Sequence, residues 1–267
     1  MDSRASSIPA DLEARLAPWI ERSADAGVFT DFDGTLAPIV DDPAAAAAVP
    51  GALEVLGRLA RRYRRVAVIS GRPVDFLAGQ FGGVGGVPDG LVLIGLYGLE
   101  RLEGGLLHLR DGAEAWAEIV DAVADAAERD APAGVLVERK SLAVGLHVRR
   151  RPERLGWVEA YATEQAAATG LVAQEGKLAY ELRPPLRVDK GTIVAELAAG
   201  LASVCFAGDD TGDLPAFAAL GRLRAEGVAT LGIAARSAES PPAVLAAADV
   251  VVDGPPGVLD VWRRLVD

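Results

Sequence analysis

The sequence predicts an α/β protein in which a parallel sheet, covered by helices on both faces, is interrupted by a smaller inserted α+β domain. Short apolar runs alternate with segments of helical spacing along most of the chain. Strands that are apolar on both faces are typical of parallel sheets with helices on each side. The middle of the chain breaks this alternation, and 51% of the 267 residues are hydrophobic, enough for a large core and a second domain.

The expected core strands are short and apolar. They cover residues 28–31, 66–70, 91–95, 203–208, 228–233 and 249–252. Helical spacing separates them, as in Leu53, Leu56 and Leu59, and again in Ile193, Val194 and Leu197. We therefore expect one core domain built from residues 1–103 and 186–267.

The inserted segment, residues 104–185, is expected to contain a helix, a pair of strands, a second helix and a second pair of strands. The apolar residues of its two helices are Trp116, Ile119, Val120 and Val123, then Trp157, Val158 and Tyr161. Apolar and polar residues alternate over 141–149 and 177–183, which predicts a small sheet with an apolar back and a basic, polar front. That front is either a cap over a site or a solvated sheet face. Pro184 and Pro185 form a stiff exit suited to a hinge.

Two carboxylates follow the first strand at the most informative point of the sequence. Asp31 and Asp33 are two residues apart, and Gly34 and Thr35 then turn the chain away. Side chains at i and i+2 share one face in extended structure, so both carboxylates can point at one place. Such a pair suits a hard cation, or a division of work between a nucleophile and a general acid. An Asp-rich turn that only ends a strand is the alternative.

Three further motifs follow strands or open a helix. Ser70 ends the second strand beside a glycine and can donate to a phosphoryl oxygen. Lys190 stands in the first turn of a helix, where its positive charge is unfavourable because the helix dipole is positive at that end. This position favours a lysine that pairs with phosphate or carboxylate over a surface lysine. Asp209, Asp210 and Asp213 crowd one strand end and require a cation or a lysine to compensate them. Parallel sheets bind ligands beyond these strand ends, so the motifs are expected to form one site that can hold Mg²⁺.

The composition narrows the classes of partner. With a net charge of −11 and a sequence pI of about 4.8, the chain is not expected to bind nucleic acid. The single Cys205 lies in an apolar run and is expected to be a core residue. No apolar run is long enough to cross a membrane, and the N-terminus is unlike a secretory signal, so a cytoplasmic location is expected.

Taken together, these motifs resemble the haloacid dehalogenase (HAD) superfamily of phosphatases, and within it the trehalose-6-phosphate phosphatase family. The residues that carry the resemblance lie at 31–39, 70–72, 95–100, 137–140, 147–149, 176–177, 181–185, 188–191 and 208–213. Two segments depart from the family pattern. Tyr97 stands where many relatives have His, and Gly212-Asp213-Leu214 stands where many relatives have Thr-Asp-Glu.

The resemblance implies a Rossmann-like HAD core and hydrolysis of trehalose 6-phosphate with Mg²⁺ through an aspartyl-phosphate intermediate. It implies these roles: nucleophile Asp31, general acid and base Asp33, phosphate contacts Ser70 and Lys190, metal ligands Asp31, Asp209 and the carbonyl of Asp33. Asp210 and Asp213 are expected to orient metal-bound water or Lys190 rather than to bind the metal. The expected substrate contacts are Gly71, Arg72, Lys140, His147 and Glu181. A functional link to a trehalose-phosphate synthase is a further expectation.

Other readings of the same residues stay open. A phosphatase of this superfamily acting on sucrose 6-phosphate or mannosyl-3-phosphoglycerate has the same catalytic residues and differs only in cap contacts. A phospho-acceptor signalling domain also combines clustered Asp, a hydroxyl residue and a Lys. Such domains, however, have a single acceptor Asp in place of the Asp31 and Asp33 pair, and they have no inserted domain. A sugar-phosphate sensor without catalysis is a third reading.

Overall fold

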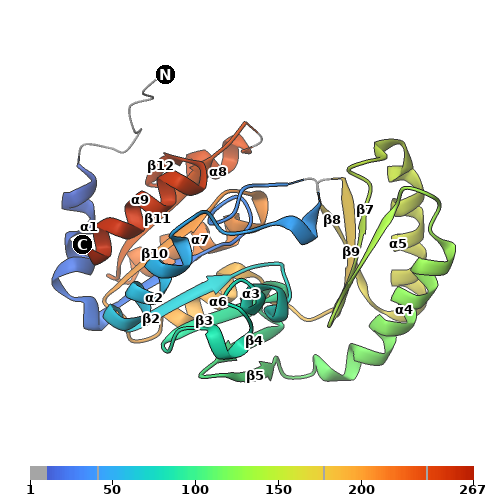
Figure 1. Ribbon diagram of the computed structural model, residues 1–267, viewed down its shortest axis with the longest axis horizontal. Coiled ribbons are helices and arrows are strands. Elements are labelled where there is room, and N and C mark those ends of the chain that lie inside the picture. The colour runs from blue at the N-terminus through green and yellow to red at the C-terminus, as the bar shows by residue number, and fades with distance from the viewer. Residues whose placement is uncertain (1–10, 41, 177, 239) are drawn as a thin grey trace. The chain divides into compact units, whose positions relative to one another are not determined.

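The computed structural model of the protein describes residues 11–40, 42–176, 178–238 and 240–267. The chain divides into two compact units, one made of residues up to 108 together with 188–267, the other of residues 109–187 (Figure 1). The sequence-based boundaries fall after residues 103 and 185, a few residues away. Within the described ranges, no helix combines the length and hydrophobicity that a membrane span requires.

The first unit is built on an eight-stranded sheet in the order β12-β11-β10-β1-β2-β3-β4-β5. Its strands are β1 Ala26–Thr30, β2 Arg65–Ile69, β3 Leu91–Gly95, β4 Glu100–Glu103, β5 Leu106–Leu109, β10 Ser203–Gly208, β11 Ala229–Arg236 and β12 Val250–Asp253. All six predicted strands are present, and the pairings from β12 to β3 are parallel. The predicted α/β class is therefore confirmed.

The limits of the predicted strands shift slightly. β1 ends at Thr30 and β2 at Ile69, so Asp31 and Ser70 lie just beyond the strands rather than inside them. The backbone N–H of Asp31 still donates to the Ala207 carbonyl at 2.8 Å, and that of Ser70 to the Ile94 carbonyl at 2.9 Å. Both residues thus continue the direction of their strands, with their side chains at the carboxyl edge of the sheet.

Helices cover both faces of this sheet. They are α1 Leu12–Glu21, α2 Ala52–Arg62, α3 Val74–Gly79, α6 Lys190–Ala198, α7 Leu214–Ala225, α8 Pro242–Ala247 and α9 Gly254–Val266. Alternate side chains of a strand point to opposite faces. Val28 of β1 and Phe206 of β10 point to opposite faces of the sheet, because Phe206 is in register with Phe29. Val28 belongs to the core cluster that includes residues of α1, α2 and α9. Phe206 packs edge-on against Phe217 of α7, with ring centroids 5.6 Å apart.

The hairpin formed by β4 and β5 was not predicted. β4 runs antiparallel to β3, and β5 extends the sheet beyond β4. The turn between them has positive φ at both Gly104 (56°) and Gly105 (77°), a conformation that glycine adopts without steric cost. Each strand has only four residues, too few for alternation to reveal them.

The second unit is an α+β domain with a four-stranded antiparallel sheet in the order β6-β7-β9-β8. Its elements are α4 Ala117–Asp130, β6 Leu136–Lys140, β7 Ala143–His147, α5 Leu155–Thr169, β8 Val172–Gly176 and β9 Ala179–Arg183. The predicted sequence of helix, strand pair, helix and strand pair is confirmed. Leu142, Val144, Leu146 and Val148 are buried, as the alternation predicts. Lys177, expected on the polar face, lies outside the described residues.

Candidate active site

The first strand of the core delivers two acidic residues to the edge of the sheet. Asp31 is 4% exposed and Phe32, also buried, belongs to the core cluster, while Asp33 is half-buried. Gly34 then turns the chain with φ of 75°, and its N–H donates to the Ala37 carbonyl at 2.7 Å. The burial of Phe32 between two carboxylates anchors the segment, so both carboxylates belong to the sheet edge rather than to a free loop.

Lys190 lies between two of the predicted acidic residues. Its Nζ is 2.7 Å from Asp31 Oδ1 and 2.6 Å from Asp213 Oδ1, and all three side chains are almost completely buried. Lys190 is the first residue of α6, whose N-cap residue Asp189 accepts from the Thr192 N–H. The sequence-based expectation of a special use for this lysine agrees with its burial between carboxylates.

Asp213 uses both carboxylate oxygens. Oδ1 accepts from Lys190, and Oδ2 accepts from the N–H groups of Asp209 (2.8 Å) and Asp210 (3.1 Å). Asp210 in turn accepts from the Gly212 N–H at 2.8 Å, which completes a capping box at the start of the turn before α7. Asp213 therefore shapes the loop and holds Lys190.

The carboxylate of Asp209 lies directly over Gly34. A Cβ at Gly34 would be 2.0 Å from Asp209 Oδ2, so glycine is required there by space as well as by its positive φ. The Thr35 hydroxyl donates to Asp209 Oδ1 at 3.4 Å. The loops after β1 and β10 are adjacent because these two strands are paired in parallel.

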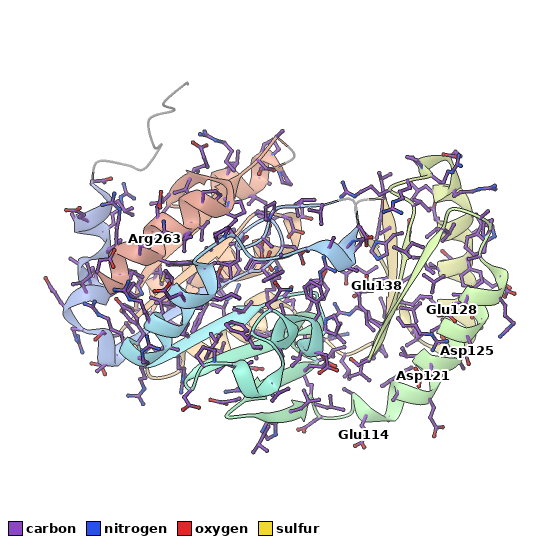
Figure 2. The ribbon with its side chains drawn as sticks, viewed as in Figure 1. Glu114, Asp121, Asp125, Glu128, Glu138 and Arg263 are labelled. Carbon is purple, nitrogen blue, oxygen red and sulfur yellow. The ribbon has the colours of Figure 1, made fainter. Side chains whose placement is uncertain are left out.

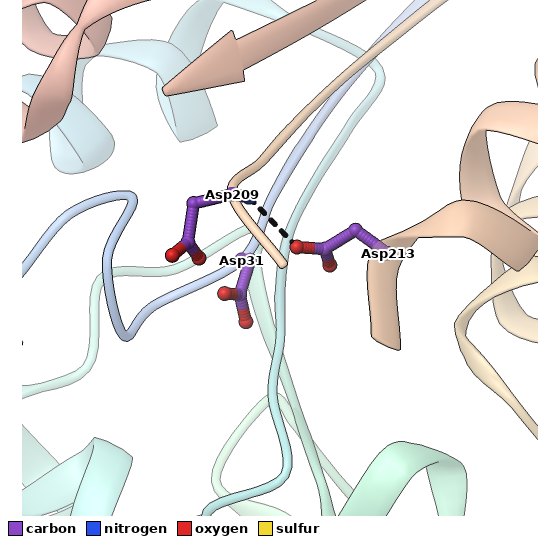
Figure 3. A group of neighbouring side chains, drawn as sticks. All are labelled: Asp31, Asp209 and Asp213. Carbon is purple, nitrogen blue, oxygen red and sulfur yellow. Dashed lines mark hydrogen bonds between the residues drawn. The ribbon is translucent and has the colours of Figure 1, made fainter. Parts of the chain in front are cut away.

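Ligand oxygens of Asp31, Asp209 and Asp213 all lie within 4.8 Å of one another (Figure 3). When all three of these buried carboxylates are ionised, they face one buried ammonium, that of Lys190, and two negative charges are in excess. A divalent cation would balance them, and carboxylate oxygens are the ligands that Mg²⁺ prefers. Because both oxygens of Asp213 already accept hydrogen bonds, Asp31 and Asp209 are the residues that fit a cation.

The electrostatics of the site reflect burial and crowding. Burial, followed by the charges of Asp213 and Asp210, raises the pKa of Asp209 to about 8. Burial also raises the pKa of Asp31 well above its usual value, although Lys190 opposes this. For Lys190, burial would lower the pKa of the ammonium, but Asp213 and Asp31 outweigh it and raise that pKa well above its usual value. The ammonium of Lys190 is therefore charged. The neighbouring carboxylates repel one another, and binding of a cation or a proton relieves that repulsion.

The segment after β2 forms the next part of the site. Ser70 is 1% exposed, and its Oγ accepts from the Arg72 N–H at 3.2 Å. The guanidinium of Arg72 forms two parallel hydrogen bonds with Asp33, each 2.8 Å long. Tyr97 lies against this loop, since a Cβ on Gly71 would be 2.6 Å from its ring. The sequence analysis identified Arg72 and Asp33 separately. The two residues are 39 positions apart, and no sequence pattern at that distance predicts that they pair.

The predicted substrate contacts of the inserted domain gather on its own sheet. Lys140 of β6 forms an ion pair with Glu181 of β9 and lies 3.8 Å from Glu138, whose carboxylate is 2.8 Å from His147 Nε2. Lys140 is only 8% exposed in this network. Glu138 was weighed as a polar partner but not chosen as a site residue, and the structure places it between Lys140 and His147.

The neighbouring residue Arg139 belongs to a different set of contacts. It pairs with Asp121, Asp125 and Glu128, three acidic residues that follow one another along α4 (Figure 2). Successive residues of a strand point to opposite faces, so Arg139 lies on the helix-covered side of the sheet and Glu138 and Lys140 on the other. The expected polar front is thus formed by Glu138, Lys140, His147 and Glu181.

Comparison with known proteins identifies the family. A family model described as trehalose-phosphatase matches residues 29–248. The chain belongs to the trehalose-phosphatase family. A trehalose-phosphate phosphatase of Mycobacterium tuberculosis (strain ATCC 25618 / H37Rv) is 37% identical over 195 residues, which cover 71% of this chain and 48% of that protein. One of Mycobacterium leprae (strain TN) is 33% identical over 235 residues, 82% of this chain and 53% of the relative. The chain therefore spans about half the length of these curated relatives.

Solved structures agree on the fold. The C-terminal domain of a Candida albicans trehalose-6-phosphate phosphatase superposes with a TM-score of 0.75 at 24% identity, over 97% of this chain and 98% of that one. A haloacid dehalogenase-like hydrolase from Bacteroides thetaiotaomicron superposes with a TM-score of 0.62 at 15% identity, over 90% and 99%. The family and the HAD-like fold expected from the sequence are both confirmed.

Proposed function

We propose that this trehalose-phosphatase family member hydrolyses trehalose 6-phosphate to trehalose and phosphate, with Asp31 as the nucleophile. The observation that carries the proposal is the buried contact between Asp31 and Lys190, beside the carboxylate of Asp209. A carboxylate held by an ammonium at the edge of a parallel sheet is oriented for attack on phosphorus. The mycobacterial relatives bearing the trehalose-phosphate phosphatase name support the substrate.

The reaction proceeds in two displacements. An Asp31 oxygen forms a bond to phosphorus while the bond from phosphorus to the sugar oxygen breaks, and Asp33 gives its proton to that leaving oxygen. Asp33, now a carboxylate, then takes a proton from the water that attacks the aspartyl phosphate, which releases phosphate and restores the Asp31 carboxylate and the protonated Asp33. Lys190 and Ser70 stabilise the negative charge of the transferred group.

The residues around Asp31 also fit a divalent cation, by resemblance Mg²⁺. Asp31, Asp209 and the carbonyl oxygen of Asp33 would hold it, and bound there it would neutralise charge on the phosphoryl oxygens. Asp213 contributes indirectly, because it fixes Lys190 and the backbone of Asp209.

We assign recognition of the sugar to residues of the inserted domain, residues 104–185 in the sequence-based division. Lys140, His147 and Glu181 offer donors and acceptors that suit the many hydroxyls of a neutral disaccharide. Their mutual contacts support the assignment, since a half-buried polar network keeps its side chains oriented. Gly71 completes the proposed substrate contacts, whereas Arg72, also expected among them from the resemblance, pairs with Asp33. A functional link to a trehalose-phosphate synthase remains part of the proposal.

Phosphate release by the purified protein tests the proposal. We expect a strong preference for trehalose 6-phosphate over sucrose 6-phosphate, glucose 6-phosphate and mannosyl-3-phosphoglycerate, with activity lost on chelation and restored by Mg²⁺. Asp31→Asn should abolish turnover while the protein stays folded. Asp25→Asn is the matched control, because Asp25 is an exposed residue before the opposite end of β1.

The outcomes separate the competing functions. Preference for another ester would keep the Asp31 mechanism and discard the substrate. A stable phosphorylated protein that does not release phosphate would favour a phospho-acceptor domain. Binding of sugar phosphate without hydrolysis would favour a sensor.

A further inference from the structure

The pairing of Arg72 with Asp33 is a contact of the site that the proposed mechanism does not use. Arg72 Nε donates to Asp33 Oδ2 and Nη2 donates to Asp33 Oδ1, both at 2.8 Å. The side chains are 12% and 29% exposed, so neither is a freely moving surface group. Parallel double hydrogen bonds of this kind fix the plane of a carboxylate as well as its distance.

The guanidinium is itself held from several sides. It lies over the ring of Phe76, 4.5 Å from the centroid, and that ring meets Phe32 edge-on at 5.7 Å. The backbone of Arg72 is fixed too, since its N–H donates to Ser70 Oγ and its carbonyl accepts from the Leu96 N–H at 3.0 Å. The position of the Asp33 carboxylate is therefore set by residues of the loop after β2, of α3 and of the loop after β3.

From this geometry we infer that Arg72 is a positioning residue, which acts on the reaction by holding the Asp33 carboxylate in place for proton transfer to the leaving oxygen. The inference rests on the proposed function. The edge of a guanidinium formed by Nε and Nη2 is the edge that would bind a phosphate through two hydrogen bonds. In this structure Asp33 occupies that edge. The resemblance assigned Arg72 to substrate binding, whereas the contacts assign it to Asp33.

The step on which Arg72 acts has a defined balance. As the bond between phosphorus and the ester oxygen breaks, its electron pair stays on that oxygen and a proton carried by Asp33 neutralises it, which leaves Asp33 as the carboxylate that Arg72 binds through two hydrogen bonds. A sugar alkoxide is a poor leaving group and needs this proton, whereas p-nitrophenolate is stable in water and does not. Loss of Asp33 positioning should therefore slow sugar esters selectively.

The experiment compares kcat/KM for trehalose 6-phosphate and p-nitrophenyl phosphate. This constant covers the steps up to departure of the leaving group, so the later attack of water, common to both substrates, does not enter. Arg72→Gln should lower the ratio of the two constants at least tenfold, Asp33→Asn should lower it about a hundredfold, and Arg72→Lys should lie between Arg72→Gln and the unchanged protein. The double variant should equal Asp33→Asn, because residues that act as one unit are not additive.

Arg101→Gln is the matched control, since Arg101 also donates through Nε and Nη2 to a carboxylate, that of the exposed Glu103. Its ratio should stay within twofold of the unchanged protein. Urea unfolding gives a readout without catalysis: the midpoint shift of the double variant should be smaller than the sum of the Arg72→Gln and Asp33→Asn shifts.

Several results would overturn the inference. If Arg72→Gln lowers kcat/KM equally for both substrates and raises KM, Arg72 is a phosphate ligand. The same conclusion follows if the effects of Arg72→Gln and Asp33→Asn on kcat/KM are additive in the double variant. Hydrolysis of p-nitrophenyl phosphate but not trehalose 6-phosphate would reject only the proposed substrate, and the ratio would then be measured with the sugar phosphate that is hydrolysed fastest. Absence of phosphatase activity towards every ester would overturn both proposals.

Discussion

Replacement of Asp213 by asparagine probes the buried charge cluster. The carboxylate accepts three hydrogen bonds, from Lys190 at 2.6 Å and from the N–H groups of Asp209 and Asp210. Both of its oxygens are acceptors, whereas an asparagine amide has one acceptor oxygen and one NH₂ donor. The substituted side chain must therefore point a donor either at Lys190 or at the two backbone N–H groups.

The expected loss of stability follows from these contacts. A hydrogen bond to a charged group is worth about 1.5–3 kcal/mol, and a buried donor left without an acceptor costs about 1–3 kcal/mol. Removal of the charge also relieves repulsion with Asp31 and Asp209, which keeps the net loss near the lower end of the range of about 3–5 kcal/mol for a broken buried ion pair. We expect about 3 kcal/mol, or a fall in Tm of about 6–12 °C for a unit of this size.

Thermal unfolding followed by circular dichroism, together with urea unfolding, measures this loss. The matched control is Asp260→Asn, because Asp260 pairs with Arg263 at 3.2 Å on the surface of α9, with both side chains 46% exposed. That control should change stability by no more than about 0.5 kcal/mol. The reasoning is refuted if Asp213→Asn matches the control or stabilises the protein.

Three further predictions concern the core. Gly34→Ala introduces a Cβ at φ of 75° and 2.0 Å from Asp209 Oδ2. It should lower the free energy of unfolding by about 1–3 kcal/mol and reduce phosphate release at least tenfold. Unchanged values in urea unfolding and in the phosphatase assay would contradict this. Cys205 is buried, and burial raises its pKa, so a disulfide reagent should label it only after unfolding; rapid labelling of the native protein would argue against its burial. Burial raises the pKa of Tyr63 from 10.0 to about 12, so the unfolded chain loses this proton at a lower pH than the folded protein does. The free energy of unfolding should therefore stay constant up to about pH 10 and then fall by about 2–3 kcal/mol towards pH 12. Urea unfolding of Tyr63→Phe should lack that part of the fall.

The part of the candidate site that lies on the core domain could be predicted because its residues are tied to strand ends. Asp31 and Ser70 each follow an apolar run, and parallel strands bring such ends to one edge. Lys190 was predicted from its unfavourable position in a first helical turn, and its burial between Asp31 and Asp213 explains that position.

What the sequence did not predict depends on contacts between distant residues. The pairing of Arg72 with Asp33 arises from the way the loop after β2 folds over Phe76, and no periodicity encodes it. Likewise, the hydrogen bonds that two backbone N–H groups donate to Asp213 depend on the path of one loop. The β4–β5 hairpin was missed because short edge strands carry little pattern.

The pairing of β1 with β10 has a consequence for synthesis of the chain on the ribosome. β1 lies between β2 and β10, and Thr30 is in register with Ala207. When the chain has emerged only as far as the residues before β10, β1 has β2 as its neighbour and still forms an edge of its sheet. Asp31 then lacks the loop that bears Asp209 and Asp213 until that loop has been translated as well. Nascent chains should thus complete the candidate site only after β10 has joined the sheet, and until then the unpaired edge of β1 is open to a chaperone that binds strand edges.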